Sequence, residues 1–315
     1  MKLIPEIQSI VTEIEKVIYG KRDVIYLTLA SLLAGGHVLI EDVPGVGKTT
    51  LANALGKATG LDMRRAQFTP DVMASDLTGF SMWNKDKGVF EYKDGLLRCN
   101  IFLADEINRT PPKTQSALLE AMEERKISAD GNTIPLPEPF MVIATQNELG
   151  YIGTYPLPEA QLDRFLMRLS IGYPSYEEET SLVSARRGTD PMNRISAVTD
   201  APTIRDYIKR ANAVTVDESV AAYIVSIVRN TREHKAVKLG CSPRAGILLM
   251  RAAQAVAFMS GRNYVIPEDA VNIVIPVLTH RLELKPEARG MDVKRILLDC
   301  INRTPVPSRH IPAHA

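Results

Sequence analysis

A short glycine-rich segment, "GVGKT" at residues 45–49, has the residue types of a phosphate-binding loop. Its glycines allow the backbone to turn tightly and to bring successive N–H groups close to an anion. Lys48 could then reach the β- and γ-phosphates of a nucleotide, and the Thr49 hydroxyl could ligate Mg²⁺. An ordinary strand-to-helix turn is the alternative. The loop follows an apolar run and opens a helical pattern, which favours phosphate binding, so we expect ATP and Mg²⁺ as cofactors.

The residue that leads into this loop departs from the usual pattern. In G-x-x-x-x-G-K-[ST] the first glycine would stand at position 42, where this chain has Asp42. Asp42 lies at the exit of the apolar run, before the tight part of the loop, and aspartate is tolerated in such turns. A carboxylate beside a phosphate would repel it. Phosphate binding therefore requires the Asp42 carboxylate to point away from the loop.

Two adjacent acids, Asp105 and Glu106, follow a second apolar run in "IFLADEINR". Asp105 is suited to contact a metal ion directly or through water, and Glu106 is suited to polarise an attacking water molecule. In isolation, adjacent acids are more typical of a solvated turn. Their position after four apolar residues, downstream of a phosphate-binding loop, favours a role in hydrolysis.

One amide and three arginines complete the candidate chemistry. Asn147 ends a third apolar run in "VIATQNE" and could hold a water molecule or contact the γ-phosphate. A transferred phosphoryl group also needs compensating cations, which the same chain or a neighbouring one can supply. The candidates are Arg109, Arg164 and Arg244. Each could equally be a surface arginine paired with an acid, and the residues alone leave this open.

The elements that must position these groups are parallel strands and their connecting helices. The apolar runs in "HVLIED", "CNIFLADE" and "FMVIATQN" are uniformly apolar, as in strands that are covered on both faces. Ligands bind at the carboxyl ends of such strands. The loop opens a helix that closes at Gly60, and "TQSALLEAMEERK" has the pattern of a crossover helix. We expect an α/β fold with a parallel sheet sandwiched by helices.

Two stretches predict surface hairpins inserted into this domain. Residues 67–97 contain the alternating segment "KGVFEYKDG", and "ISADGNTIPLP" contains Asp130-Gly131, a typical hairpin turn. Breaker-rich residues then separate the α/β region from repeated helical patterns. We expect the following order: α/β nucleotide-binding domain at residues 1–190, linker at 191–202, small all-helical domain at 203–303, and proline-rich, poorly ordered tail at 304–315.

The composition excludes several classes of protein. The chain has 315 residues and 38 Lys and Arg against 37 Asp and Glu, so its net charge of +1 favours neither nucleic acid nor an anionic membrane as a partner. Three separated cysteines argue against a disulfide framework or a zinc site and fit a cytoplasmic location. The uncharged run at residues 24–40 is broken by Gly35-Gly36-His37, so we expect a buried helix and strand and no membrane span.

Longer stretches of the chain resemble AAA+ ATPases and, within them, the MoxR family. They extend over most of the chain from the phosphate-binding loop to about the last helix, and read "EDVPGVGKT", "FLADEINRTPPKTQSALLEAMEE", "ATQNELGYIGTYPLPEAQLDRF", "GCSPRAGILLMRAAQAVA" and "VIPEDAVNIVIPVLTHRL". The resemblance implies an AAA+ P-loop NTPase fold with a helical lid domain. The chain departs from the family at Gly95-Leu96 and Asn147-Glu148, where the family often has proline at the second position, so the loop after Asn147 could differ in shape.

The resemblance also implies roles for individual residues. Walker A would include Lys48 and Thr49, Walker B would be Asp105 and Glu106, and sensor 1 would be Asn147. Arg164 is placed like an arginine finger, and Arg244 like sensor 2 on the lid. We expect catalysis by Lys48, Glu106, Asn147 and Arg164, and metal contacts by Thr49 and Asp105. The expected nucleotide-binding residues are Ile18, Tyr19, Gly20, Pro44, Gly45, Val46, Gly47, Lys48, Thr49, Thr50 and Arg244.

The resemblance implies a homo-oligomeric ring, a hexamer, in which Arg164 completes the site of the next subunit and the hairpins face the pore or a neighbour. It further implies a chaperone-like role in the maturation or activation of client protein complexes, with a von Willebrand factor A domain partner and in some cases metal insertion. A DNA-acting AAA+ motor, a magnesium-chelatase-like ATPase subunit and a non-hydrolysing switch are the alternatives. The balanced charge disfavours the first, and Glu106 with Asn147 disfavours the last.

Overall fold

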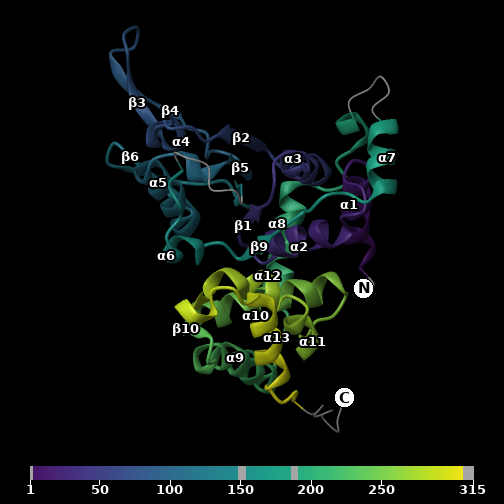
Figure 1. Cartoon of the computed structure of the whole chain (residues 1–315). Helices are drawn as coiled ribbons and strands as arrows, with labels where there is room; N and C mark the ends of the chain where they lie inside the picture. The colour runs from purple at the N-terminus through teal and green to yellow at the C-terminus, as the bar shows by residue number, and fades with distance from the viewer. Residues whose placement is uncertain (1–2, 148–153, 186–190, 308–315) are drawn as a thin grey trace. The chain divides into compact units, whose positions relative to one another are not determined.

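The computed structural model describes residues 3–147, 154–185 and 191–307, and these divide into two compact units. The first unit is Leu3–Ile208, and the second begins at Lys209. Each unit is described by itself below (Figure 1). Residues 191–202, which the sequence predicts to be a linker, include a 3₁₀ turn at Pro191–Arg194 and the start of a helix, both within the first unit. The domain boundaries stay predictions.

A five-stranded parallel sheet forms the centre of the first unit. Its spatial order is β2-β5-β8-β1-β9. The strands are β1 (Val38–Glu41), β2 (Met63–Gln67), β5 (Ile101–Asp105), β8 (Met141–Gln146) and β9 (Met167–Leu169). The three strands predicted from apolar runs, β1, β5 and β8, are confirmed and occupy the middle of the sheet. β2 and β9, which the sequence did not predict, are the two edge strands.

Helices flank the sheet, as predicted. The helices of this part of the chain are α1 (Pro5–Glu15), α2 (Arg22–Leu33), α3 (Lys48–Thr59), α4 (Ala74–Thr78), α5 (Pro112–Glu124), α6 (Glu159–Leu162), α7 (Tyr176–Ala185) and α8 (Ala201–Asn212), of which α8 continues past the end of the first unit. α3 contacts β2 and β5 and packs against α1, whereas Leu118 and Met122 of α5 share a buried cluster with Phe102 and Val142 of the strands. α3 ends at Gly60 in the left-handed conformation, which confirms the predicted end of this helix.

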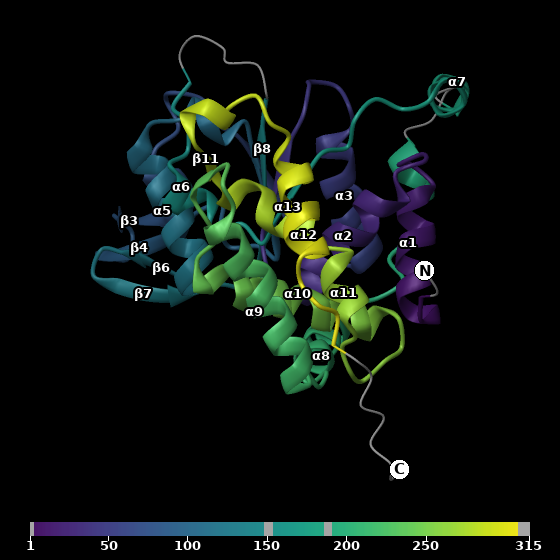
Figure 2. The same ribbon diagram turned by 60° about the horizontal axis from the view of Figure 1, so that its bottom comes forward.

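Both predicted hairpins are present. The first consists of β3 (Gly79–Asn84) and β4 (Val89–Asp94), and the second of β6 (Lys126–Ala129) and β7 (Asn132–Pro135). The second hairpin turns through Asp130 and Gly131, both with positive φ. The hairpins lie side by side, and the Asp130 carboxylate accepts the N–H of Ser81 at 2.6 Å (Figures 1 and 2). The two insertions therefore form one surface feature.

The second unit is mainly helical, as predicted. Its helices are α9 (Glu218–Glu233), α10 (Pro243–Met259), α11 (Pro267–Val271), α12 (Val274–Leu278) and α13 (Val293–Asn302). It also contains a short antiparallel pair, β10 (Val237–Leu239) with β11 (Glu283–Leu284), which the sequence did not predict. Thr304, the first residue of the predicted tail, is buried against Asn230 and Cys300. In the ranges that the structure describes, no helix is long and apolar enough to span a membrane.

His37 is a buried polar link between the sheet and α5. Its Nδ1 accepts the N–H of Val142 at 2.9 Å, and its Nε2 lies 3.1 Å from the Met122 carbonyl oxygen. A ring that accepts at Nδ1 and donates at Nε2 is the neutral tautomer. Burial, together with the nearby Arg125 guanidinium, holds the pKa of His37 well below its ordinary value of 6.5, although the bond to Met122 acts in the opposite direction. The folded protein therefore keeps His37 uncharged.

We predict that His37 makes the stability of the protein pH-dependent. Its pKa is lower in the folded than in the unfolded chain, so its contribution is complete above the unfolded value of about 6.5 and is lost as the pH falls below it. The free energy of unfolding should fall there by about 1.4 kcal/mol per pH unit from this group. The His37→Gln variant keeps one donor and one acceptor but cannot titrate, so it should show a smaller slope. Urea titrations between about pH 5 and about pH 7.5 measure both slopes, and equal slopes would contradict the prediction.

Candidate functional site

The glycine-rich loop connects β1 to α3 and has the backbone that anion binding needs. Gly45 and Gly47 have φ of +85° and +98°, values that side chains disfavour. Gly47 is the residue before the first turn of α3, where N–H groups have no partner within the helix. A Cβ atom on Gly47 would lie 3.9 Å from Cδ1 of Ile18, so the segment between α1 and α2 passes beside the loop. The loop can therefore receive a phosphate with an apolar side chain close by.

The Asp42 carboxylate points away from the loop, toward the segment that follows β9. Its Oδ2 accepts the N–H groups of Ile171 and Gly172, both at 2.7 Å, and the Ser170 hydroxyl at 2.9 Å. Its Oδ1 accepts the N–H of Val43 at 2.8 Å. Burial would raise the pKa of Asp42, but these hydrogen bonds, that of Gly172 foremost, lower it below its ordinary value. The negative charge is thus satisfied locally, as the sequence requires.

The Lys48 ammonium is buried at the exits of β1 and β8. It donates to the Asp42 carbonyl oxygen at 2.7 Å, the Gln146 carbonyl oxygen at 3.2 Å and the Asn147 Oδ1 at 3.0 Å. These contacts hold the Lys48 side chain beside the glycine-rich loop, where a lysine ammonium can attract an anion. The contact to Asn147 brings together two residues that the sequence predicted separately.

Asp105 ends β5 and has partners on both carboxylate oxygens. Oδ1 accepts the Thr145 hydroxyl at 2.6 Å. Oδ2 accepts the Thr49 hydroxyl at 3.3 Å, and the Arg65 guanidinium at 2.8 Å from Nη2 and 3.2 Å from Nε. The predicted pair of Thr49 and Asp105 is therefore in contact, with an arginine that the sequence did not suggest.

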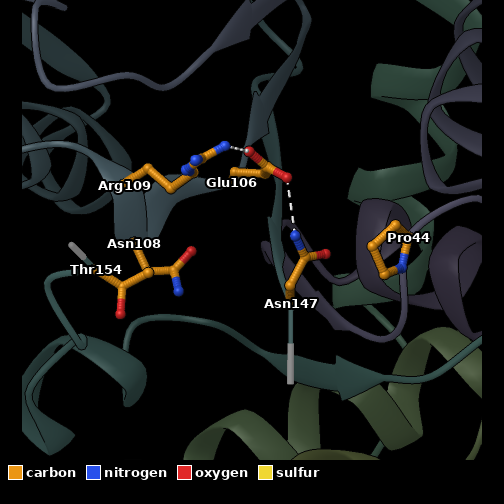
Figure 3. A pocket seen from close by; sticks show the side chains of 6 residues that line it. All are labelled: Pro44, Glu106, Asn108, Arg109, Asn147 and Thr154. Carbon is orange, nitrogen blue, oxygen red and sulfur yellow. Dashed lines mark hydrogen bonds and ion pairs between the residues drawn. The ribbon is translucent and has the colours of Figure 1, made fainter. Parts of the chain in front are cut away.

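Glu106 follows Asp105 in a left-handed conformation, with φ of +57°. Such backbone strain in a residue other than glycine is concentrated at functional sites. The Glu106 N–H donates to the Thr145 hydroxyl at 2.8 Å, which secures the turn. Oε1 accepts Asn147 Nδ2 at 2.8 Å, and Oε2 accepts Arg109 Nη1 and Gln67 Nε2, both at 2.9 Å (Figure 3). The carboxylate is therefore held from three directions.

A small cavity of about 130 Å³ lies in front of Glu106 and Asn147. Pro44 lies across from Glu106, so the cavity extends from the glycine-rich loop to the end of β5 (Figure 3). Its lining residues are Pro44, Glu106, Asn108, Arg109, Asn147 and Thr154. This space has the size of a few water molecules and is bordered by a carboxylate and an amide that can orient one.

Arg164 has its own partners within the first unit, and Arg244 is not part of that unit. Arg164 forms an ion pair with Glu123 at 2.6 Å and donates to the Leu119 carbonyl oxygen of α5 at 2.7 Å. It lines a second cavity, of about 320 Å³, with Ser116, Leu119, Glu120, Glu123, Glu124 and Gln161. Arg244 belongs to the second unit, where it is the second residue of α10. The roles of both arginines stay predictions.

Sequence reasoning missed three side chains that organise the site: Arg65, Gln67 and Thr145. Thr145 precedes Gln146 and Asn147 on a predicted strand, so its polarity within an apolar run was an available signal. Arg65 and Gln67 are on β2, in "MRRAQ", which has no apolar pattern. They are two residues apart and so share one face of the strand, but that signal appears only after the strand has been recognised.

Comparisons with known proteins agree on the family. Residues 37–167 match the family model "ATPase family associated with various cellular activities (AAA)", and residues 229–299 match the "AAA lid domain" model. Among curated relatives, the chaperone MoxR1 of Mycobacterium tuberculosis is 36% identical, over 97% of this chain and 86% of its own length. Protein MoxR of Methylorubrum extorquens is 30% identical, over 87% of this chain and 86% of its own.

A solved structure gives the same result. The crystal structure of a proposed ATPase from Cytophaga hutchinsonii is similar with a TM-score of 0.89 and 37% identity, over 96% of this chain and 95% of that one. The similarity therefore includes residues of both units. With a glycine-rich loop at the end of β1, two acids at the end of β5 and relatives that match nearly the whole chain, this protein belongs to the MoxR family of AAA+ ATPases.

Proposed function

We propose that this chain binds ATP with Mg²⁺ and hydrolyses it, with Glu106 as the residue that polarises the attacking water. The observation that carries the proposal is the position of the Glu106 carboxylate. Its Oε1 accepts Asn147 Nδ2 at 2.8 Å. The Oδ1 atom of Asn147 in turn accepts the Lys48 ammonium at 3.0 Å. One amide thus connects the residue that would activate water to the residue that would bind phosphate.

The residues present fit a magnesium ion. The Thr49 hydroxyl and Asp105 Oδ2 are 3.3 Å apart at the start of α3 and the end of β5. Mg²⁺ prefers hard oxygen ligands and takes few of them from the protein, because waters and substrate phosphates supply the rest. Thr49 would contact the ion, and Asp105 would hold it directly or through water. Bound Mg²⁺ would neutralise the negative charge that develops on the phosphates.

The remaining steps of the proposed reaction belong to the protein. The N–H groups of the glycine-rich loop and of the first turn of α3 would bind the phosphates, and Lys48 would turn from its carbonyl partners toward them. Asn147 would hold the water in the cavity that it lines with Glu106. Glu106 would then accept a hydrogen bond from that water and align it with the γ-phosphate.

We further propose that the protein acts as a homo-oligomeric ring, a hexamer, in which Arg164 serves the neighbouring subunit. On its own chain Arg164 is bound to Glu123 and lies in a different cavity from the one in front of Glu106. The Arg164 side chain is 29% exposed, so a neighbour could reach it. An arginine supplied in trans to a phosphoryl group is a common device in nucleotide hydrolysis.

The proposed cellular role is the maturation or activation of client protein complexes in the cytoplasm, with a von Willebrand factor A domain partner and, in some cases, metal insertion. The name "Chaperone MoxR1" of a relative supports the chaperone-like part. The first hairpin offers a surface for a protein partner, because Phe90 and Trp83 are 71% and 49% exposed and their rings pack edge to face at 5.1 Å.

We predict that Glu106→Gln separates binding from hydrolysis. The amide keeps the shape and polarity of the side chain but cannot polarise water as a carboxylate does, so turnover should fall by about 100-fold or more while ATP binding stays within about twofold. Phosphate release and fluorescent-nucleotide binding measure the two quantities. Glu6→Gln, on an exposed position of α1, is the matched control and should keep full activity. Equal turnover of Glu106→Gln and the parent protein would exclude the proposed role of Glu106.

We also predict that inactive variants complement each other in mixed rings. Arg164→Ala and Glu106→Gln should each be inactive alone, but a mixture should recover part of the activity, because Glu106→Gln subunits supply Arg164 to the intact sites of their neighbours. Phosphate release from the mixture measures the recovery. A mixture of Lys48→Ala with Glu106→Gln is the control, since neither subunit has an intact site. Strictly additive activities in the first mixture would exclude action in trans.

A further inference from the structure

Arg65 holds the Asp105 carboxylate from the neighbouring strand. β2 and β5 are paired in parallel with Gln67 opposite Asp105, so Arg65 and Gln67 lie on the same face of β2 beside the end of β5. The Arg65 guanidinium donates to Asp105 Oδ2 from Nη2 at 2.8 Å and from Nε at 3.2 Å. Two donors from one guanidinium to a carboxylate oxygen form a charge-assisted contact.

The oxygen that Arg65 binds is the one that faces the candidate metal site. Oδ2 of Asp105 is also the oxygen that Thr49 contacts, whereas Oδ1 is taken by Thr145. A divalent cation between Thr49 and Asp105 would therefore use the same oxygen as the guanidinium. We propose that Arg65 is a positioning residue that occupies the cation-facing oxygen of Asp105 and has to leave it before Mg²⁺ can bind there. This inference rests on the proposed nucleotide site.

Arg65 also connects Asp105 to Glu106. Its Nη2 donates to Gln67 Oε1 at 3.1 Å, and Gln67 Nε2 donates to Glu106 Oε2 at 2.9 Å. The guanidinium thus fixes the direction of the Gln67 amide, with the oxygen toward Arg65 and the nitrogen toward Glu106. When Arg65 leaves Asp105, this orientation loses its support. The metal contact of Asp105 and the hydrogen bonds of Glu106 are therefore coupled through Arg65 and Gln67.

The exposure of the pair suits an exchangeable contact. The Arg65 side chain is 47% exposed and the Asp105 side chain 11%. A half-exposed guanidinium keeps water on one side, so Arg65 can leave Asp105 and be hydrated by solvent. A fully buried pair would instead resist separation, because each charge would be left without water. Arg65 can thus neutralise Asp105 without blocking the site permanently.

The test measures how strongly Mg²⁺ tightens nucleotide binding. Fluorescent ADP is titrated into the full chain with excess EDTA and with saturating Mg²⁺. The Kd in EDTA divided by the Kd in Mg²⁺ gives the coupling between metal and nucleotide. In Arg65→Met the ratio should rise by about two- to fivefold, because no cation competes for Asp105. Arg65→Lys should lie between Arg65→Met and the parent protein, since it keeps the charge but loses the two-donor contact.

Arg64→Met is the matched control. Arg64 is adjacent on β2 and has a similar exposed fraction, 38%, but its guanidinium contacts the Gly95 carbonyl oxygen and Asp62. The ratio of Kd values for Arg64→Met should equal that of the parent protein. An unchanged or smaller ratio in Arg65→Met would overturn the inference, the smaller one showing that Arg65 supports the metal. If Arg65→Met does not fold, judged by circular dichroism, the same criterion applies to Arg65→Lys.

The experiment separates this inference from the proposed function. If the parent protein binds fluorescent ADP in neither condition, the proposed nucleotide site is wrong and the role of Arg65 is overturned with it. If the parent binds ADP more tightly with Mg²⁺ and Arg65→Met shows the same ratio, the nucleotide site stands and only the role of Arg65 is overturned.

Discussion

The site depends on the hydrogen bonds that hold the buried ammonium of Lys48. A charge taken out of water has to be surrounded by polar atoms, and here these atoms are oxygens at the ends of β1 and β8. The end of the neighbouring strand β5 carries the carboxylates of Asp105 and Glu106, and these charges also need polar partners. The result is a chain of contacts across four neighbouring strands, in the order Lys48, Asn147, Glu106, Gln67, Arg65 and Asp105.

The strand order of the sheet makes this row of contacts possible. Parallel strands bring their carboxyl ends to one edge, so residues far apart in sequence can form a continuous row there. β5 lies between β2 and β8, and its two acids therefore receive an arginine and a glutamine from one side and a threonine and an asparagine from the other. The buried cores of the strands hold these side chains in place, since a shift of one residue would turn them to the opposite face.

The central part of the fold and of the site could be predicted because its signals are local. β1, β5 and β8 are covered on both faces and are therefore uniformly apolar, and the loop needs glycine wherever φ is positive. β2 and β9 could not be predicted in this way. β2 has a single buried position, and β9 has only three residues. The partners of Asp105 were missed for a further reason, since they depend on which strand is adjacent, and a local pattern does not contain this information.

Asp42 connects two parts of the structure, through its carboxylate and through its carbonyl oxygen. Its carboxylate holds the backbone of residues 170–172, and its carbonyl oxygen holds the Lys48 ammonium at 2.7 Å. The held segment continues from β9 into α7. Because both groups are on one residue, a displacement of that segment must either break the carboxylate's hydrogen bonds or move the carbonyl that holds Lys48. The acid at the entrance of the loop thus connects the backbone beyond β9 directly to the Lys48 ammonium.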